Sequence, residues 1–159
     1  MKKITSFTVD HNELLRGIYV SRKDIVGGEI VTTFDIRMKE PNREPVVDVP
    51  ALHTIEHLGA TFLRNHSKWA EKTLFFGPMG CRTGCYILFH GDYASEDVVP
   101  VVRELFEFIA NYREEIPGAS AAECGNYLSH DLPMARLEAR KFLKEVLDNL
   151  QEENLKYPD

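Results

Sequence analysis

The stretch Pro50-Ala51-Leu52-His53-Thr54-Ile55-Glu56-His57 decides how the rest of the chain must be arranged. Proline is favoured in the first turn of a helix, so we predict a helix from about Ala51 to Arg64. One side of this helix is apolar, formed by Leu52, Ile55, Gly59 and Phe62. A polar stripe lies beside that face. Such a helix is expected to lie on a sheet, with a pocket at its edge.

Residues 53–57 read H-x-x-E-H, the inverse of the H-E-x-x-H zinc signature. His53 and His57 are one helical turn apart, so they can bind one metal ion together. Glu56 lies near the same face, where it can move protons beside the ion. Two solvated histidines on a helix would show the same spacing. A catalytic metal usually has three protein ligands and one open position, so the rest of the chain must supply a third ligand.

The length and charge of the chain limit the function classes. A chain of 159 residues is expected to fold as a single domain over residues 1–159. The net charge of −6 argues against nucleic acid or an anionic membrane as a main partner. No apolar run approaches the ~18 residues needed to span a bilayer, and no apolar export segment follows Met1 to Ser6. With three cysteines, reduced thiols and a cytoplasmic location are expected.

The remaining pattern predicts short strands and two further helices. Strands are expected at residues 18–20, 29–38, 73–76 and 85–89, with a turn at Gly27-Gly28. The strand at 29–38 alternates and is expected to be half-buried. Helices are expected from Ser95 or Asp97 to Tyr112, and from an Asp131 cap to about Leu150. The tail from Gln151 is expected to fray. The predicted fold class is α+β: a single domain with an antiparallel sheet of about four strands packed with helices, and the metal-binding helix at one edge.

Two cysteines are candidates for chemistry. Cys124 lies among small residues and could be the third metal ligand, or simply a buried apolar residue. A His-His-Cys set suits Zn, Fe(II) or Co(II). Cys81 lies on a glycine-rich loop beside Arg82, which favours a thiolate for acid/base or nucleophilic work. A structural cysteine or a redox partner of Cys85 are the alternatives; Cys85 itself looks like core. The polar residues Ser6, His11 and Arg37 have no specific meaning alone.

Taken together, these segments resemble the S-ribosylhomocysteine lyase (LuxS) family, which makes the precursor of autoinducer-2. The matching segments, in order, are Ser6, Asp10-His11, residues 34–37, residues 52–57, residues 77–84, residues 123–127 and His130-Asp131-Leu132. They extend through nearly the whole chain. Each is short, and their order and spacing make the resemblance specific.

The resemblance implies a homodimer of small α+β subunits with two active sites at the subunit interface. It assigns one divalent metal per subunit, Fe(II) in the native state, to His53, His57 and Cys124. It makes Cys81 and Glu56 the catalytic proton-transfer groups. The substrate-binding residues that it implies, in part from the neighbouring subunit, are Ser6, His11 and Arg37.

The implied reaction converts S-ribosylhomocysteine to homocysteine and 4,5-dihydroxy-2,3-pentanedione. The C5–S bond of the ribose has no acidic proton beside it. Two aldose–ketose isomerisations therefore move the carbonyl from C1 to C3, through enediolates that a Lewis acid stabilises. The C3 ketone acidifies the C4 proton, and β-elimination releases the thiolate. Protons move on opposite sides of the sugar, which explains two acid/base groups.

Three positions depart from the common family pattern. Phe75 replaces an acidic residue, Gly77 replaces a serine, and Cys85 replaces an aromatic residue. Two rival interpretations also exist. An H-x-x-E-H metallopeptidase would normally have a carboxylate third ligand in a much larger chain. A non-catalytic metal-binding module would need four protein ligands and would not require Glu56 or the Cys81 loop.

Overall fold

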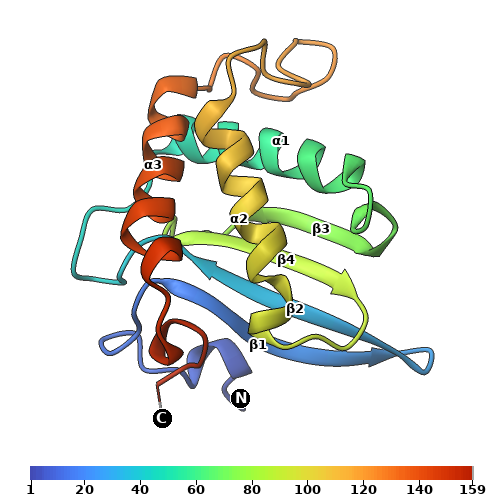
Figure 1. The fold of residues 1–159 in the computed structure, drawn as a ribbon, viewed down its shortest axis with the longest axis vertical. Coiled ribbons are helices and arrows are strands. Elements are labelled where there is room, and N and C mark those ends of the chain that lie inside the picture. Colours follow the sequence, from blue (N-terminus) through green and yellow to red (C-terminus); the bar gives the residue numbers. More distant parts are fainter. Residues whose placement is uncertain (159) are drawn as a thin grey trace.

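Two antiparallel hairpins pair side by side to form the sheet in the computed structural model, which describes residues 1–158 (Figure 1). The strand order is β1-β2-β4-β3, and all pairings are antiparallel. The strands are β1 (Gly17–Val26), β2 (Glu29–Arg37), β3 (Thr73–Pro78) and β4 (Gly84–His90). The helices are α1 (Val49–Asn65), α2 (Ser95–Asn111) and α3 (Leu132–Glu145). The predicted α+β class with a four-stranded antiparallel sheet is confirmed.

The first hairpin is longer than its apolar pattern indicated. Gly27 and Gly28 form its turn with φ angles of 62° and 90°, a conformation that glycine adopts without a Cβ clash. β1 extends well beyond the predicted residues 18–20. Its second half, from Arg22 to Val26, is mostly exposed. Apolar and polar residues therefore do not alternate there as they do in a strand with one buried face. Pairing with β2 maintains the strand there.

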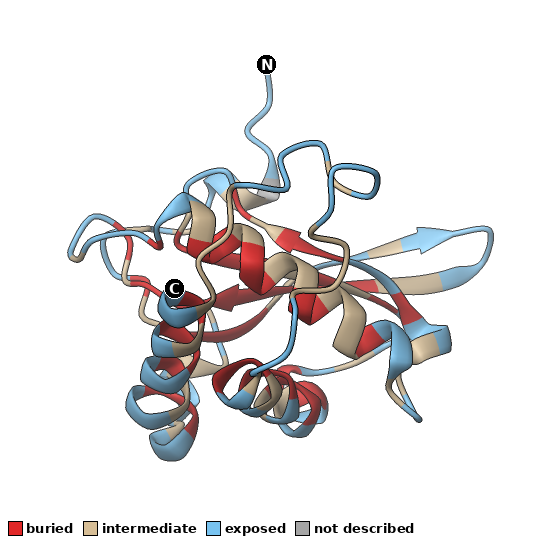
Figure 2. Cartoon of the chain, turned by 90° about the horizontal axis from the view of Figure 1, so that it is seen from above, coloured by how far each residue is buried: buried red, intermediate tan, exposed pale blue. Residues whose placement is uncertain are grey.

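β2 is buried on both faces, so the prediction of a half-buried strand was wrong. Phe34 and Ile36 face the core. The alternate residues Thr33, Asp35 and Arg37 are buried as well. Terminal segments of the chain cover this second face, and Figure 2 shows α2 and α3 on one side of the sheet and the N-terminal segment on the other. A charged pair is therefore enclosed in the middle of the molecule.

The three helices pack on one face of the sheet and enclose the hydrophobic core (Figure 1). α1 lies so close to β3 that a Cβ on Gly59 would sit 2.2 Å from the Phe76 ring. The apolar residues predicted to point inward from α2 are buried, namely Val98, Val102, Leu105 and Ile109. Of the helices formed by residues 1–158, none is long and apolar enough to cross a membrane.

The start of α2 differs in detail from the prediction. Ser95 is the first helical residue rather than the cap, and its hydroxyl donates to the Leu155 carbonyl at 2.8 Å. Ala94 occupies the cap position, and its N–H donates to the Asp97 carboxylate at 2.8 Å. Ser95 therefore links the helix start to the C-terminal segment instead of closing the helix.

α3 begins as predicted and ends earlier. The Asp131 side chain caps it by accepting a hydrogen bond from the Met134 N–H at 2.9 Å. The apolar spacing suggested a helix to about Leu150, but α3 ends at Glu145 because Val146 leaves the helical region, with φ −122° and ψ −65°. A short 3-10 turn (Leu147–Asn149) follows. Val146 and Leu147 remain buried in the core without helical backbone.

The C-terminal segment is packed against the sheet, so the prediction of a frayed tail was wrong for its described residues. It contains a 3-10 turn (Glu152–Asn154). The Tyr157 ring stacks on Tyr19 with 4.8 Å between ring centroids. The Tyr157 hydroxyl donates to the Asp35 carboxylate at 2.8 Å. The polar composition of this segment did not predict the docking, because the contacts are made by individual side chains and backbone carbonyls.

Replacing Tyr157 by phenylalanine keeps the ring stack and removes only the hydroxyl. We expect Tyr157→Phe to lower the free energy of unfolding by about 1.5–3 kcal/mol, since the lost bond is to a buried charged group. Urea unfolding measures this change. Tyr112→Phe, which removes an exposed hydroxyl bonded to the Glu115 carbonyl, is the matched control. Equal stability of Tyr157→Phe and the unmodified protein would show that the tail contact does not stabilise the fold.

Candidate metal centre and active site

Four side chains with metal-binding atoms meet at the first turns of α1. They are His53 and His57 of α1, and Cys124 and His130 of the segment between α2 and α3, with ligand atoms within 4.8 Å of one another. The predicted trio is thus brought together, although Cys124 is 67 residues beyond His57 in the chain. The cluster is half-buried. Its donor set of imidazoles and a thiol fits one transition-metal ion.

Backbone carbonyls orient the two α1 histidines toward the cluster. His53 Nδ1 lies 2.7 Å from the Ser129 carbonyl oxygen, and His57 Nδ1 lies 2.7 Å from the Pro117 carbonyl oxygen. A carbonyl can only accept, so each Nδ1 carries a proton, and Nε2 is the ring nitrogen left to face the cluster. The Cys124 sulfur lies 3.5 Å from His53 Nε2. The donors therefore already have the orientation that metal binding requires.

His130 is the member of the cluster that the sequence did not predict as a site residue. Thr54 Oγ1 donates to the Pro50 carbonyl and accepts from the Asp131 N–H, so its only proton is already used. His130 Nδ1, 3.1 Å from Thr54 Oγ1, must then be the donor in that contact. Its Nε2 is buried and has no partner among the described residues. Burial and the neighbouring His53 and His57 rings lower the pKa of His130, so the ring stays neutral at pH 7.

Ring orientation limits which of the three histidines can bind one ion together. The His53 and His57 rings meet edge to face, at an interplanar angle of 84°. The His130 ring instead stacks on His53, with centroids 4.1 Å apart and planes 18° from parallel. An imidazole lone pair lies in the plane of its ring, so two stacked rings cannot both point at one ion. The His57 ring is also edge to face with His130, at 80°, so ring orientation alone does not choose between His53 and His130. The Cys124 sulfur lies 3.5 Å from His53 Nε2, and this contact favours His53, His57 and Cys124 as joint ligands.

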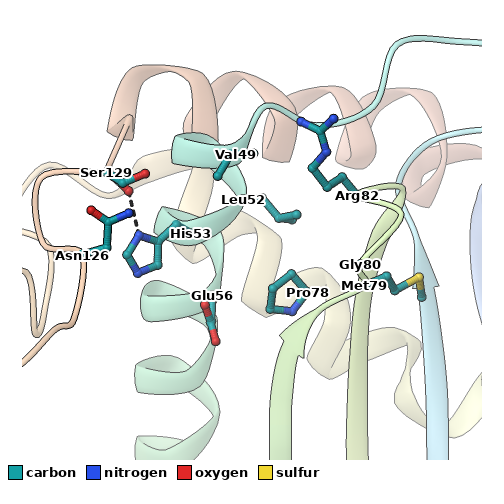
Figure 3. A pocket seen from close by; sticks show the side chains of 10 residues that line it. All are labelled: Val49, Leu52, His53, Glu56, Pro78, Met79, Gly80, Arg82, Asn126 and Ser129. Carbon is teal, nitrogen blue, oxygen red and sulfur yellow. Dashed lines mark hydrogen bonds between the residues drawn. The ribbon is translucent and has the colours of Figure 1, made fainter.

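A cavity of about 390 Å³ opens next to the cluster (Figure 3). His53 and Glu56 line it from α1, and Asn126 and Ser129 line it from the segment before α3. In Figure 3, Glu56 and Pro78 lie on opposite sides of this space. Glu56 is half-buried, which is suitable for a carboxylate that meets a ligand. The sequence prediction that Glu56 lies beside the metal site is consistent with this position.

A second cavity, of about 550 Å³, holds the other predicted site residues. Its lining includes Ser6, His11, Arg37 and Cys81. Met79 and Gly80 line both cavities, so this loop separates them. The predicted residues thus form two groups in one chain: a metal group with Glu56, and a Cys81 group with Ser6, His11 and Arg37.

The cation that contacts Cys81 is Arg37 rather than its neighbour Arg82. Arg37 Nη1 lies 3.9 Å from the Cys81 sulfur, whereas Arg82 lines the first cavity. Burial lowers the pKa of Arg37, but the Asp35 carboxylate outweighs this effect and raises the pKa above its ordinary value. Arg37 is therefore a permanent cation. This contact links residues 44 positions apart and could not be read from the local sequence.

The three positions that depart from the family pattern have distinct surroundings. Cys85 is completely buried, burial raises the pKa of its thiol, and it is a core residue as expected. All three cysteines are free thiols. The Phe75 ring covers Gly77, since a Cβ at residue 77 would lie 2.4 Å from that ring. In this chain, a side chain at residue 77 would collide with the Phe75 ring in its present position.

Comparison with known proteins gives one consistent family. Residues 4–153 match the family model described as S-Ribosylhomocysteinase (LuxS). An S-ribosylhomocysteine lyase of Phocaeicola vulgatus is 62% identical over 158 residues, covering 99% of this chain and 98% of the relative. One from Porphyromonas gingivalis is 61% identical over 159 residues and one from Borreliella burgdorferi 59% identical over 158, each covering at least 99% of both chains. The chain belongs to the S-ribosylhomocysteinase (LuxS) family.

Proposed function

We propose that this protein is a metal-dependent S-ribosylhomocysteine lyase, which forms homocysteine and 4,5-dihydroxy-2,3-pentanedione, and that residues 1–159 act as one such domain. The family match and the lyase relatives support the reaction. The observation that carries the proposal is the convergence of two oriented imidazoles and a thiol beside the cavity of Glu56.

We propose one divalent metal per subunit, held by His53, His57 and Cys124. The mixed imidazole and thiolate set suits Fe(II), the metal expected for this family, and also Zn or Co(II). When bound, the ion supplies Lewis-acid stabilisation of the negative charge that develops on the sugar oxygens. The 3.5 Å contact between the Cys124 sulfur and His53 Nε2 supports this ligand set.

Glu56 and Cys81 are the proposed proton carriers. Two isomerisations and one elimination move several carbon-bound and oxygen-bound protons, and general acid–base groups typically contribute about 10²–10⁴-fold to such steps. Glu56 lies in the cavity beside His53, where a carboxylate can take a proton from a bound sugar. Cys81 is exposed in the second cavity, so its sulfur can reach a ligand.

The proposed enzyme is a homodimer whose active sites lie at the subunit interface. Glu56 and Cys81 line different cavities of the same chain, separated by Met79 and Gly80. A dimer that places the first cavity of one chain against the second cavity of its partner would complete both sites. Ser6, His11 and Arg37 would then bind the substrate from the partner's side.

The proposed location is the cytoplasm, and the proposed product is the autoinducer-2 precursor. Three free thiols without a disulfide support a reducing compartment. A metallopeptidase is not favoured, because the third donor of the cluster is Cys124 rather than a carboxylate and the full-length relatives are lyases.

Metal binding can be tested without substrate. The purified protein is expected to bind one Co(II) per chain and to lose heat stability when a chelator removes it. His57→Ala should abolish stoichiometric binding, measured by elemental analysis after dialysis. His90→Ala is the control, because His90 is exposed and contacts Glu29 far from the cluster. Retention of one Co(II) per chain by His57→Ala would overturn the ligand assignment.

The lyase reaction can be followed by titrating the thiol that S-ribosylhomocysteine releases. Anaerobically prepared, Fe(II)- or Co(II)-loaded protein should release homocysteine. Glu56→Gln and Cys81→Ala should each keep the metal but lose at least about 100-fold in kcat. Glu107→Gln, which removes an exposed carboxylate of α2, should behave like the unmodified protein. No thiol from the loaded protein would exclude the lyase.

Whether each active site combines residues of both subunits can be tested by pairing the two inactive variants. In a heterodimer of Glu56→Gln and Cys81→Ala chains, one site keeps both groups if they come from different subunits. Random pairing makes about half the dimers mixed, so co-expressed chains should recover about one quarter of the unmodified activity. No recovery in demonstrably mixed dimers would place both groups of a site in one chain.

A further inference from the structure

Thr83 contacts the sulfur of Cys81 more closely than any charged group does. Its Oγ1 lies 3.0 Å from the Cys81 sulfur, compared with 3.9 Å for the nearest Arg37 nitrogen. The Thr83 side chain is 5% exposed, so water competes little for it. At 3.9 Å, the guanidinium acts on the sulfur through its positive charge, but the hydrogen bond between them is weak. The direct polar partner of Cys81 is therefore the threonine hydroxyl.

The direction of the hydrogen bond at Thr83 follows from Arg37. Arg37 Nη1 lies 2.6 Å from Thr83 Oγ1, and a guanidinium nitrogen can only donate. Thr83 Oγ1 must accept there, which leaves its single proton available for the Cys81 sulfur. A donated hydroxyl proton stabilises a thiolate more than a protonated thiol, whose sulfur is only a weak acceptor. The positive charge of Arg37 also polarises the hydroxyl toward donation.

The backbone around Thr83 holds this arrangement in place. Its carbonyl accepts hydrogen bonds from the N–H groups of Met38 and Lys39, both at 2.9 Å. Those residues directly follow Arg37 at the end of β2. The carboxylate of Asp35 accepts from the other terminal nitrogen of Arg37. The hydroxyl, the guanidinium and the sulfur-bearing loop are therefore fixed to one strand end.

We propose that Thr83 is a positioning residue that donates its hydroxyl proton to the Cys81 sulfur, while Arg37 orients that hydroxyl. This inference rests on the proposed proton-transfer role of Cys81. It extends that role by naming the group that holds the sulfur in place and activates it before substrate arrives.

Other groups also influence the reactivity of Cys81, and a test must leave them unchanged. The charged and titratable groups near it are Asp35 and Arg37 of β2, Tyr86 of β4, His11 and Glu44 of the cavity wall, and the adjacent Arg82. A substitution at Thr83 alters none of these charges. A change in the alkylation rate of Cys81 can therefore be assigned to the hydroxyl.

The test compares Thr83→Val, which keeps the shape and removes the hydroxyl, with Thr83→Ser, which keeps the hydroxyl. The rate of Cys81 alkylation by iodoacetamide is measured against pH, with the modified peptide quantified by mass spectrometry. Thr83→Val should slow alkylation at neutral pH about tenfold, because the reacting sulfur loses one hydrogen bond. Thr83→Ser should restore the profile to within about twofold.

The outcomes are distinguishable from failure of the lyase proposal. Thr83→Val with the unmodified alkylation profile, folded and binding its metal, overturns the assignment of the hydroxyl. If the Thr83→Val variant does not fold, Thr83→Ala is used in its place, and the same slowing of Cys81 alkylation is expected. A protein that shows the Thr83→Val slowing but releases no thiol from S-ribosylhomocysteine would reject the reaction and keep the hydrogen bond. With both correct, Thr83→Val lowers kcat and leaves KM within about twofold.

Discussion

The buried ion pair between Asp35 and Arg37 is the constraint on which the rest of the structure depends. Both side chains are nearly inaccessible, at 1% and 4% exposure. Charges removed from water at this depth must be neutralised and hydrogen-bonded, or the strand that carries them is destabilised. Burial raises the pKa of Asp35, and the contacts from Arg37 and Tyr157 counteract this rise. Docking of the tail therefore adds a hydrogen bond to the buried carboxylate.

The same pair also determines where the Cys81 loop lies. Arg37 directs its Nη1 nitrogen at Thr83 and, more distantly, at Cys81. Hydrogen bonds from Met38 and Lys39 to the Thr83 carbonyl attach the loop to the end of β2. The contacts of the buried ion pair thus also hold the loop that carries Cys81, the proposed proton carrier. An arginine that is permanently charged and fixed in place is a suitable group to orient a hydroxyl beside a sulfur.

The metal cluster depends on a different part of the molecule. α1 supplies two imidazoles one turn apart, but their tautomers are determined by carbonyl oxygens of Pro117 and Ser129. The Asp131 N–H, which donates to the Pro50 carbonyl, brings the end of that segment back to the start of α1. This closure places His130 against His53. The irregular backbone of this segment is therefore part of the site, because its carbonyl oxygens accept hydrogen bonds from the histidines. In a regular helix, most carbonyl oxygens already accept bonds within the helix.

The local sequence predicted where the helices and strands lie, and most of the residue types in the candidate site. The H-x-x-E-H spacing predicted the face shared by His53 and His57, and Asp131 predicted the start of α3, because both signals act within one helical turn. The family resemblance, carried by short segments through the chain, is confirmed. Its assignments of roles to Glu56, Cys81 and the substrate-binding residues stay predictions.

Only the tertiary structure decided which distant residues meet. Three contacts join segments whose local sequence does not indicate the partner: Tyr157 with Asp35, His130 with His53, and Arg37 with Thr83. The early end of α3 was also absent from the helical pattern. The alternation in β2 indicated one buried face, yet the terminal segments cover the other. The physical reason is the same in each case. Hydrophobic and helical periodicity report local burial, whereas the partner of a buried polar group is determined by the three-dimensional packing that surrounds it.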